Sequence, residues 1–166
     1  TSKQGVDGLQ SFTGTHRRFE FRGEVSGGRV FDDYAHHPTE LAAAIGTVRE
    51  LYPGKRILGV FQPHLYSRTR DFADGFADSL SKLDELIMLE IYPARELPIP
   101  GISSSMILDK CNSGSKQLVS KDRLATVVAE SSAEVVIMLG AGDIDVLVQD
   151  VVDAVQLQQT KGALKP

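Results

Sequence analysis

Side chains that can do chemistry gather at four points of the sequence, each directly after a short apolar run. Residues 32–37 (DDYAHH), 62–70 (QPHLYSRTR), 92–96 (YPARE) and 140–143 (GAGD) together hold carboxylates, imidazoles, phenols and guanidinium groups. Arginine suits the recognition of phosphate or carboxylate, because its planar fork pairs with either group through two contacts at once. The residue types therefore predict an active-site rim that binds anionic groups.

The elements that must position these groups are predicted from the spacing of apolar residues. Short apolar runs at 57–61, 86–91 and 135–139 are typical of buried strands, and they alternate with segments whose apolar residues recur at helical spacing. This alternation predicts an α/β, Rossmann-like fold: a mainly parallel sheet of about six strands, with helices on both faces, preceded by a short β-hairpin. In such sheets ligands bind beyond the carboxyl ends of the strands, where the four polar segments lie.

The same patterns predict the remaining boundaries. The hairpin is expected between residues 18 and 31 with its turn at Gly27-Gly28, and a further short strand is expected at 117–119. Helices are expected at 39–51, over a segment ending at 80, near 104–112, at 122–130 and from 143 to 155. Ser67 or Thr69 is expected to cap the second of these helices.

Several standard signatures are missing from the chain. It contains neither the G-x-x-x-x-G-K-[ST] phosphate loop nor the G-x-S-x-G nucleophile elbow. The turn Gly140-Ala141-Gly142 resembles the start of a dinucleotide fingerprint, but Asp145 stands where the third glycine belongs, so no nicotinamide site is predicted. The glycines indicate either a tight strand-to-helix turn or a turn whose backbone N–H groups bind an anion.

Two adjacent pairs, Arg17-Arg18 and His36-His37, admit more than one interpretation. The arginines are either a solvated surface pair or a contact to phosphate groups held by a neighbouring domain. The histidines lack the i, i+4 spacing of a common helical metal pair. No metal site is therefore predicted in this chain.

Composition narrows the class of protein. A chain of 166 residues fits one globular domain, and its net charge of −4 does not suggest nucleic-acid binding. The single cysteine, Cys111, excludes an internal disulfide and favours a reducing compartment. No apolar run approaches the roughly 20 residues of a membrane span, and no signal peptide is recognisable. We therefore expect a cytoplasmic protein with neither a nucleic-acid nor a membrane partner.

Five segments occur in order along the chain: 14–20 (GTHRRFE), 32–40 (DDYAHHPTE), 61–72 (FQPHLYSRTRDF), 90–101 (EIYPARELPIPG) and 140–144 (GAGDI). Together they resemble the C-terminal domain of the Mur ligases, the enzymes that build the peptide of peptidoglycan. The third segment favours the members that join L-alanine to UDP-N-acetylmuramate over the related muropeptide ligases, which attach a tripeptide. Leu65 stands where some of these members have arginine.

The resemblance implies an ATP-dependent ligase of cell wall biogenesis, of which this chain is one part. Residues 14–158 would be the C-terminal domain, 1–13 a linker or the trailing edge of a central domain, and 159–166 a tail that frays. The N-terminal and central domains of the same polypeptide would be its partners and would hold the UDP-N-acetylmuramate, the phosphate loop and the Mg²⁺ ligands. The chain alone would be inactive.

The resemblance also assigns roles to individual residues. Arg18 would contact the phosphates or ribose of ATP, and Asp33 would accept hydrogen bonds from the ribose hydroxyls. The L-alanine pocket would be formed by Tyr34, His36, His64 and Arg68, with Arg68 on the carboxylate. No catalytic residue is confined to this domain. The alternative from another class is a non-catalytic module that binds nucleotides or anions on the same rim.

Overall fold

A computed structural model describes residues 15–25 and 28–162 of the protein. The expected hairpin turn at Gly27 and the segment 1–13 lie outside the described residues. The strands are β1 (Glu20–Val25), β2 (Gly28–Asp33), β3 (Ile57–Phe61), β4 (Glu85–Met88), β5 (Ser115–Leu118) and β6 (Val135–Leu139). The helices are α2 (Pro38–Leu51), α3 (Tyr66–Leu80), α4 (Ser104–Leu108), α5 (Lys121–Glu130), the 3-10 helix η1 (Asp143–Leu147) and α6 (Val148–Gly162).

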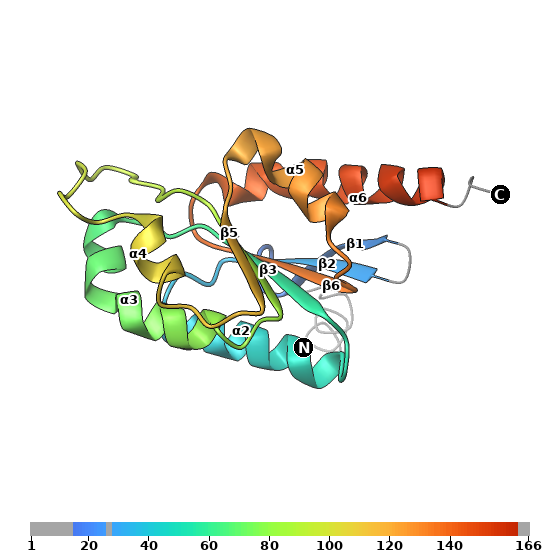
Figure 1. Ribbon diagram of the computed structural model, residues 1–166, viewed down its shortest axis with the longest axis horizontal. Coiled ribbons are helices and arrows are strands. Elements are labelled where there is room, and N and C mark those ends of the chain that lie inside the picture. The colour runs from blue at the N-terminus through green and yellow to red at the C-terminus, as the bar shows by residue number, and fades with distance from the viewer. Residues whose placement is uncertain (1–14, 26–27, 163–166) are drawn as a thin grey trace, which may run out of the picture.

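The six strands form one sheet in the order β1-β2-β6-β3-β4-β5. All neighbours pair in parallel except β1 and β2, which form the expected antiparallel hairpin. The predicted α/β fold is therefore confirmed, with β2 also serving as a parallel strand of the main sheet (Figure 1). After β5 at the edge of the sheet, the chain returns to the middle, where the last strand, β6, lies between β2 and β3. The direction in which successive strands are added to the sheet is thus reversed for β6. Crevices at such reversals are the usual ligand sites of open α/β sheets.

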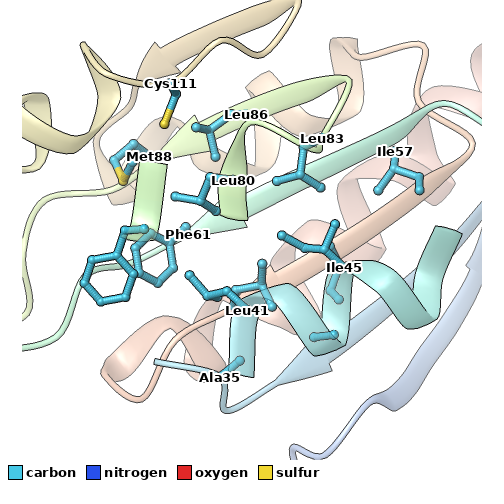
Figure 2. Packing of buried hydrophobic residues seen from close by; sticks show 14 of the residues in the cluster. Ala35, Leu41, Ile45, Ile57, Phe61, Leu80, Leu83, Leu86, Met88 and Cys111 are labelled. Carbon is cyan, nitrogen blue, oxygen red and sulfur yellow. The ribbon is translucent and has the colours of Figure 1, made fainter. Parts of the chain in front are cut away.

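Helices cover both faces of the sheet and enclose two apolar cores. Helices α2, α3 and α4 pack on one face, and α5, η1 and α6 pack on the other (Figure 1). In the first core, Leu41 and Ile45 of α2 lie against Phe61 of β3 and Leu80 of α3, all fully buried (Figure 2). Strands β3 and β6 are buried along their whole length, as expected for strands covered on both faces.

Helix α2 begins and ends as its sequence predicts. Pro38 occupies the first turn, where its missing N–H costs nothing, and the ring of His37 accepts a hydrogen bond from the N–H of Thr39. Glu40 in the first turn and Arg49 in the last complement the helix dipole. This start matters for the site, because the residues just before Pro38 form the loop that follows β2.

Some expected boundaries differ from the structure. Strand β4 ends at Met88, and α4 is a short helix that ends at Leu108. The last helical segment starts as the 3-10 helix η1 and becomes α-helical only at Val148, whose helix continues to Gly162. No helix within 15–25 and 28–162 is long and apolar enough to cross a membrane.

The expected caps of α3 are wrong. This helix begins at Tyr66, so Ser67 and Thr69 both lie inside its first turn and neither can cap it. The hydroxyl of Thr69 instead donates a hydrogen bond to the carbonyl of Leu65 at 2.8 Å. Leu65 itself precedes the helix with a positive φ of 72° and offers no polar side chain.

Candidate active site

The loops that leave the carboxyl ends of the strands are joined by backbone hydrogen bonds. The N–H of Gly140, after β6, donates to the carbonyl of Asp33 at the end of β2, at 3.1 Å. In the loops after β3 and β4, the N–H of Tyr92 donates to the carbonyl of Pro63 at 2.8 Å, and Leu65 donates back to Tyr92 at 2.9 Å. The polar segments of four strands are thus held at one edge of the sheet.

Aromatic rings form a continuous row across this edge. The rings of Tyr34 and His36 meet edge to face at 5.1 Å, and His36 lies 6.2 Å from the ring of His64. His64 stacks on Tyr92, with the ring centres 5.6 Å apart. The guanidinium of Arg18 sits over Tyr34 at 5.7 Å from its ring centre. The structure therefore brings together four residues that the family resemblance assigned to the site, namely Arg18, Tyr34, His36 and His64. It also adds Tyr92 to them.

Arg68 and His64 carry buried nitrogen atoms that have no partner. One terminal nitrogen of the Arg68 guanidinium (NH1) and Nδ1 of His64 are shielded from solvent and make no hydrogen bond. Burial and the nearby Arg68 charge lower the pKa of His64, and His36 adds to the effect. His64 is therefore neutral at pH 7, and Arg68 supplies the positive charge on this side of the site.

Arg18 and Asp33 line one hollow at this edge of the sheet. It has a volume of about 270 Å³, and Glu40 and Thr47 of α2 also line it. Each carboxylate oxygen of Asp33 accepts a backbone N–H at 2.7 Å, one from Phe19 and one from Ala35. These bonds hold the carboxylate rigidly, and each oxygen keeps a lone pair for a further donor.

Arg17 has a different role from its neighbour, and the interpretation of the arginine pair as solvated surface residues is wrong for it. Its side chain is buried, with Nε 3.2 Å from a carboxylate oxygen of Asp32 and a terminal nitrogen (NH2) 2.6 Å from the carbonyl of Gly140. Its other terminal nitrogen (NH1) lies 3.5 Å from Asp145. Arg17 thus fastens the segment before β1 to the turn after β6, while Arg18 is left exposed.

The glycine turn after β6 is packed against side chains of this chain. Gly140 has a φ of 148°, and a Cβ at Gly142 would lie 2.6 Å from the side-chain oxygen of Gln62. Gln62 is fully buried and donates to the carboxylate of Asp143 at 2.9 Å. The close approach that the glycines allow is therefore made by the protein itself, and anion binding at this turn stays a prediction.

We expect Gly142→Ala to destabilise the protein by about 1–3 kcal/mol, because the new Cβ would overlap Gln62 and also lie 2.7 Å from Cβ of Tyr92. Thermal unfolding measures the change. Gly46→Ala in α2 is the matched control, because nothing lies within 4 Å of its Cβ position. That variant should be neutral or more stable by up to about 1 kcal/mol. Equal stability of Gly142→Ala and wild type would contradict this packing.

Histidines and carboxylates at this edge do not assemble a metal centre. In the part of the chain that the structure describes, no group of three or more His, Cys, Asp or Glu side chains could hold a metal ion. The carboxylate of Glu40 accepts the backbone N–H of His36 at 2.9 Å. Nδ1 of the His36 ring lies 2.8 Å from the carbonyl of Tyr34 and 3.3 Å from the carboxylate of Glu40. Glu40, in the first turn of α2, and the carbonyl of Tyr34 therefore orient His36 together.

Comparison with known proteins shows that this chain, including the residues at this edge of the sheet, matches a known family. The family model described as "Mur ligase, glutamate ligase domain" matches residues 17–148, which include every residue of the site. The chain belongs to the Mur ligase family. Its matched relatives include the UDP-N-acetylmuramate–L-alanine ligases of Parabacteroides distasonis, 56% identical over 144 residues, and Porphyromonas gingivalis strain W83, 57% identical over 142 residues. The matches cover 87% and 85% of this chain but 31% of each relative, so the chain spans about a third of their length.

Solved structures of Mur ligases share the fold. The UDP-N-acetylmuramate-alanine ligase of Thermotoga maritima superposes with a TM-score of 0.71 at 27% identity, over 93% of this chain and 33% of that one. The murein peptide ligase of Psychrobacter arcticus superposes with a TM-score of 0.70 at 21% identity, over 90% and 32% of the two chains. The fold alone therefore does not separate these two ligases.

Sequence reasoning placed Gln62, Tyr92 and Glu96 on the rim but gave them no role. Their roles come from contacts between loops: Gln62 with the glycine turn, Tyr92 with His64, and Glu96 with Ser67. Glu40 was likewise quoted only as part of a motif. No spacing rule in the sequence indicates the contacts of Gln62, Tyr92 and Glu96, because each joins segments that follow different strands. The contact of Glu40 with His36 does have i, i+4 spacing, which was the one signal that could have found it.

Proposed function

We propose that this chain is the C-terminal domain of an ATP-dependent ligase that joins L-alanine to UDP-N-acetylmuramate. The relatives named above carry that name at more than half identity. The reaction belongs to peptidoglycan synthesis, and so to cell shape and division, and it takes place in the cytoplasm. ATP is its energy source, and Mg²⁺ is held by ligands outside this chain.

The observation that carries the proposal is the unpaired guanidinium nitrogen of Arg68. A buried N–H without a partner costs free energy, and a guanidinium offers two parallel donors that match a carboxylate. The carboxylate of L-alanine supplies that partner when it binds beside His64 and His36. Tyr34 and His36, whose rings contact each other, would form the rest of this pocket.

The hollow between Arg18 and Asp33 fits the nucleotide. A fixed carboxylate with two spare lone pairs suits the two hydroxyls of a ribose, and an exposed arginine beside it suits a phosphate. Both residues follow from the family resemblance, and their shared hollow supports that assignment. The nucleotide would then lie beside Arg18 and the amino acid beside His36, the two residues whose side chains contact the ring of Tyr34.

The chemistry divides between this domain and the rest of the enzyme. The muramoyl carboxylate attacks the terminal phosphate of ATP, which gives an acyl phosphate and ADP. The amine of L-alanine, after losing a proton, attacks the acyl carbon, and the tetrahedral intermediate expels phosphate. The residues of this chain bind and orient L-alanine through its carboxylate and, by covering the site, exclude water from the hydrolysable acyl phosphate.

Two alternatives are less well supported. A muropeptide ligase shares the fold at nearly the same TM-score, but the relatives at 56–57% identity are named as alanine ligases. A non-catalytic module would use the same rim of arginines, but the relatives carry this domain within chains about three times as long.

The complete enzyme should ligate L-alanine to UDP-N-acetylmuramate, whereas the 166-residue chain alone should not. The chain lacks a phosphate loop, so it cannot hold the ATP phosphates for transfer. Product formation with radiolabelled alanine, and separately with a tripeptide acceptor, measures both claims. Preference for the tripeptide would assign the muropeptide ligase instead, and turnover by the isolated chain would contradict the division of labour.

A further inference from the structure

The first turn of α3 needs a partner that its own sequence does not provide. The first N–H groups of a helix have no acceptor within the helix and are normally met by a capping side chain just before it. The residue in that place is Leu65, which has no polar side chain. Arg68 lies in this turn and His64 lies two residues before it, so the position of the turn decides where the amino-acid pocket lies.

Glu96, 29 residues after Ser67, supplies the missing acceptor. One oxygen of its carboxylate accepts the N–H of Ser67 at 2.9 Å, and the other accepts the hydroxyl of the same serine. The backbone N–H of Tyr66 also donates to the carboxylate of Glu96. These bonds, first of all the one from the Ser67 hydroxyl, hold the pKa of Glu96 below its ordinary value, so the carboxylate is charged at neutral pH. A charged acceptor at a helix amino terminus also complements the helix dipole.

The loop that carries Glu96 is fixed on its other side as well. The backbone of Tyr92 pairs with the loop around His64, and the two rings stack. Glu96 closes a tight turn by donating its own N–H to the carbonyl of Pro93 at 2.9 Å. The loop after β4 therefore holds the loop and helix after β3 at two points, His64 and Ser67.

We propose that Glu96 is a positioning residue of the amino-acid pocket, which holds the first turn of α3 and thereby sets the place of Arg68. The proposal rests on the proposed function, because the pocket is assigned to L-alanine there. Glu96 acts through Ser67 and Tyr66 and does not itself touch the substrate. Its loss lets the turn relax and moves the arginine away from the carboxylate it must clamp.

The test compares three variants in the complete enzyme. Glu96→Ala removes both bonds, Glu96→Gln keeps an acceptor for the backbone N–H, and Ser67→Ala removes only the hydroxyl bond. Glu50→Ala, an exposed carboxylate on α2 remote from the rim, is the matched control. Hydrogen exchange of residues 66–69, read by mass spectrometry, reports the helix start without requiring activity. Steady-state kinetics report KM for L-alanine and for ATP separately.

Glu96→Ala should speed exchange at 66–69 and raise KM for L-alanine about 10- to 100-fold, by analogy with the loss of a residue that orients a metal ligand. KM for ATP should change less than about twofold. In Glu96→Gln, KM for L-alanine should return most of the way to the wild-type value, and in Ser67→Ala it should lie between the values of the two Glu96 variants. Unchanged exchange, or faster exchange with an unchanged KM for L-alanine, would overturn the proposal. An equal rise in KM for L-alanine and in KM for ATP would indicate that Glu96 has only a general structural role, and would also overturn the proposal.

The exchange measurement separates this proposal from the function on which it rests. If the wild-type enzyme ligates no L-alanine, the proposed function fails and the pocket role of Glu96 fails with it, whatever the exchange shows. If wild type ligates L-alanine and only the Glu96 results disagree, the proposed function stands and the positioning role is wrong.

Discussion

Replacing Arg68 by alanine should reduce kcat/KM for L-alanine about 30- to 4,000-fold in the complete enzyme. The change removes the charged partner of a partly desolvated carboxylate, a loss that costs roughly 2–5 kcal/mol in comparable buried pairs. Each 1.4 kcal/mol corresponds to about one decade. KM for ATP and for UDP-N-acetylmuramate should change little, because Arg68 lies on the His64 side of the rim, away from the hollow of Arg18.

Arg70 provides the matched control for this variant. It lies two residues further along α3, its side chain is about half exposed, and it pairs with Asp71 at 2.7 Å. Arg70→Ala should keep the alanine kinetics within about twofold of wild type, since exposed pairs contribute little. Arg68→Lys should recover only part of the loss, because an ammonium supplies charge without the planar fork. An ATP-selective defect in Arg68→Ala would move this residue to the nucleotide side and remove the anchor of the alanine pocket.

The fold was predictable because burial leaves a simple pattern in this sequence. Strands β3 and β6 are fully buried, so they appear as uninterrupted apolar runs, and the helices between them show one apolar face. The rule that parallel strands end at one edge then placed Asp33, His64 and Gly140 on the same rim. The sequence motif and the topology agree on this region independently.

The finer contacts of the site were not predictable, because they join residues distant in sequence. Arg17 reaches Gly140 across 123 residues, and Glu96 reaches Ser67 across 29. Arg17 and Arg18 are adjacent and chemically identical, yet one is buried and the other exposed. The backbone of Arg17 has a positive φ of 55°, a conformation that residue type alone does not indicate. The cap of helix α3 was predicted wrongly for a similar reason, since the acceptor for its first turn comes from another loop.

The buried pair of Arg17 and Asp32 leads to the largest expected loss of stability. Asp32 is fully buried, and one of its carboxylate oxygens already has no partner. Arg17→Ala would leave this carboxylate buried and unpaired, which typically costs about 3–5 kcal/mol. Arg18→Ala, at the exposed neighbouring position, should change the free energy of unfolding by less than about 0.5 kcal/mol. Chemical denaturation of the two variants in parallel measures the difference.

The same variant should acquire a characteristic pH dependence. Burial raises the pKa of Asp32 above its ordinary value, and the Arg17 charge opposes that rise. Without Arg17 the pKa rises further, so the folded state binds a proton that the unfolded state releases near its ordinary pKa of about 3.9. Stability of Arg17→Ala should therefore fall as pH rises through the pKa of Asp32 in the folded variant, and return on acidification. Adding Asp32→Asn should remove this pH dependence and recover part of the lost stability, because no charge is then buried. If Arg17→Ala were as stable as Arg18→Ala at neutral pH, the buried ion pair would not be what fastens the segment before β1 to the turn after β6.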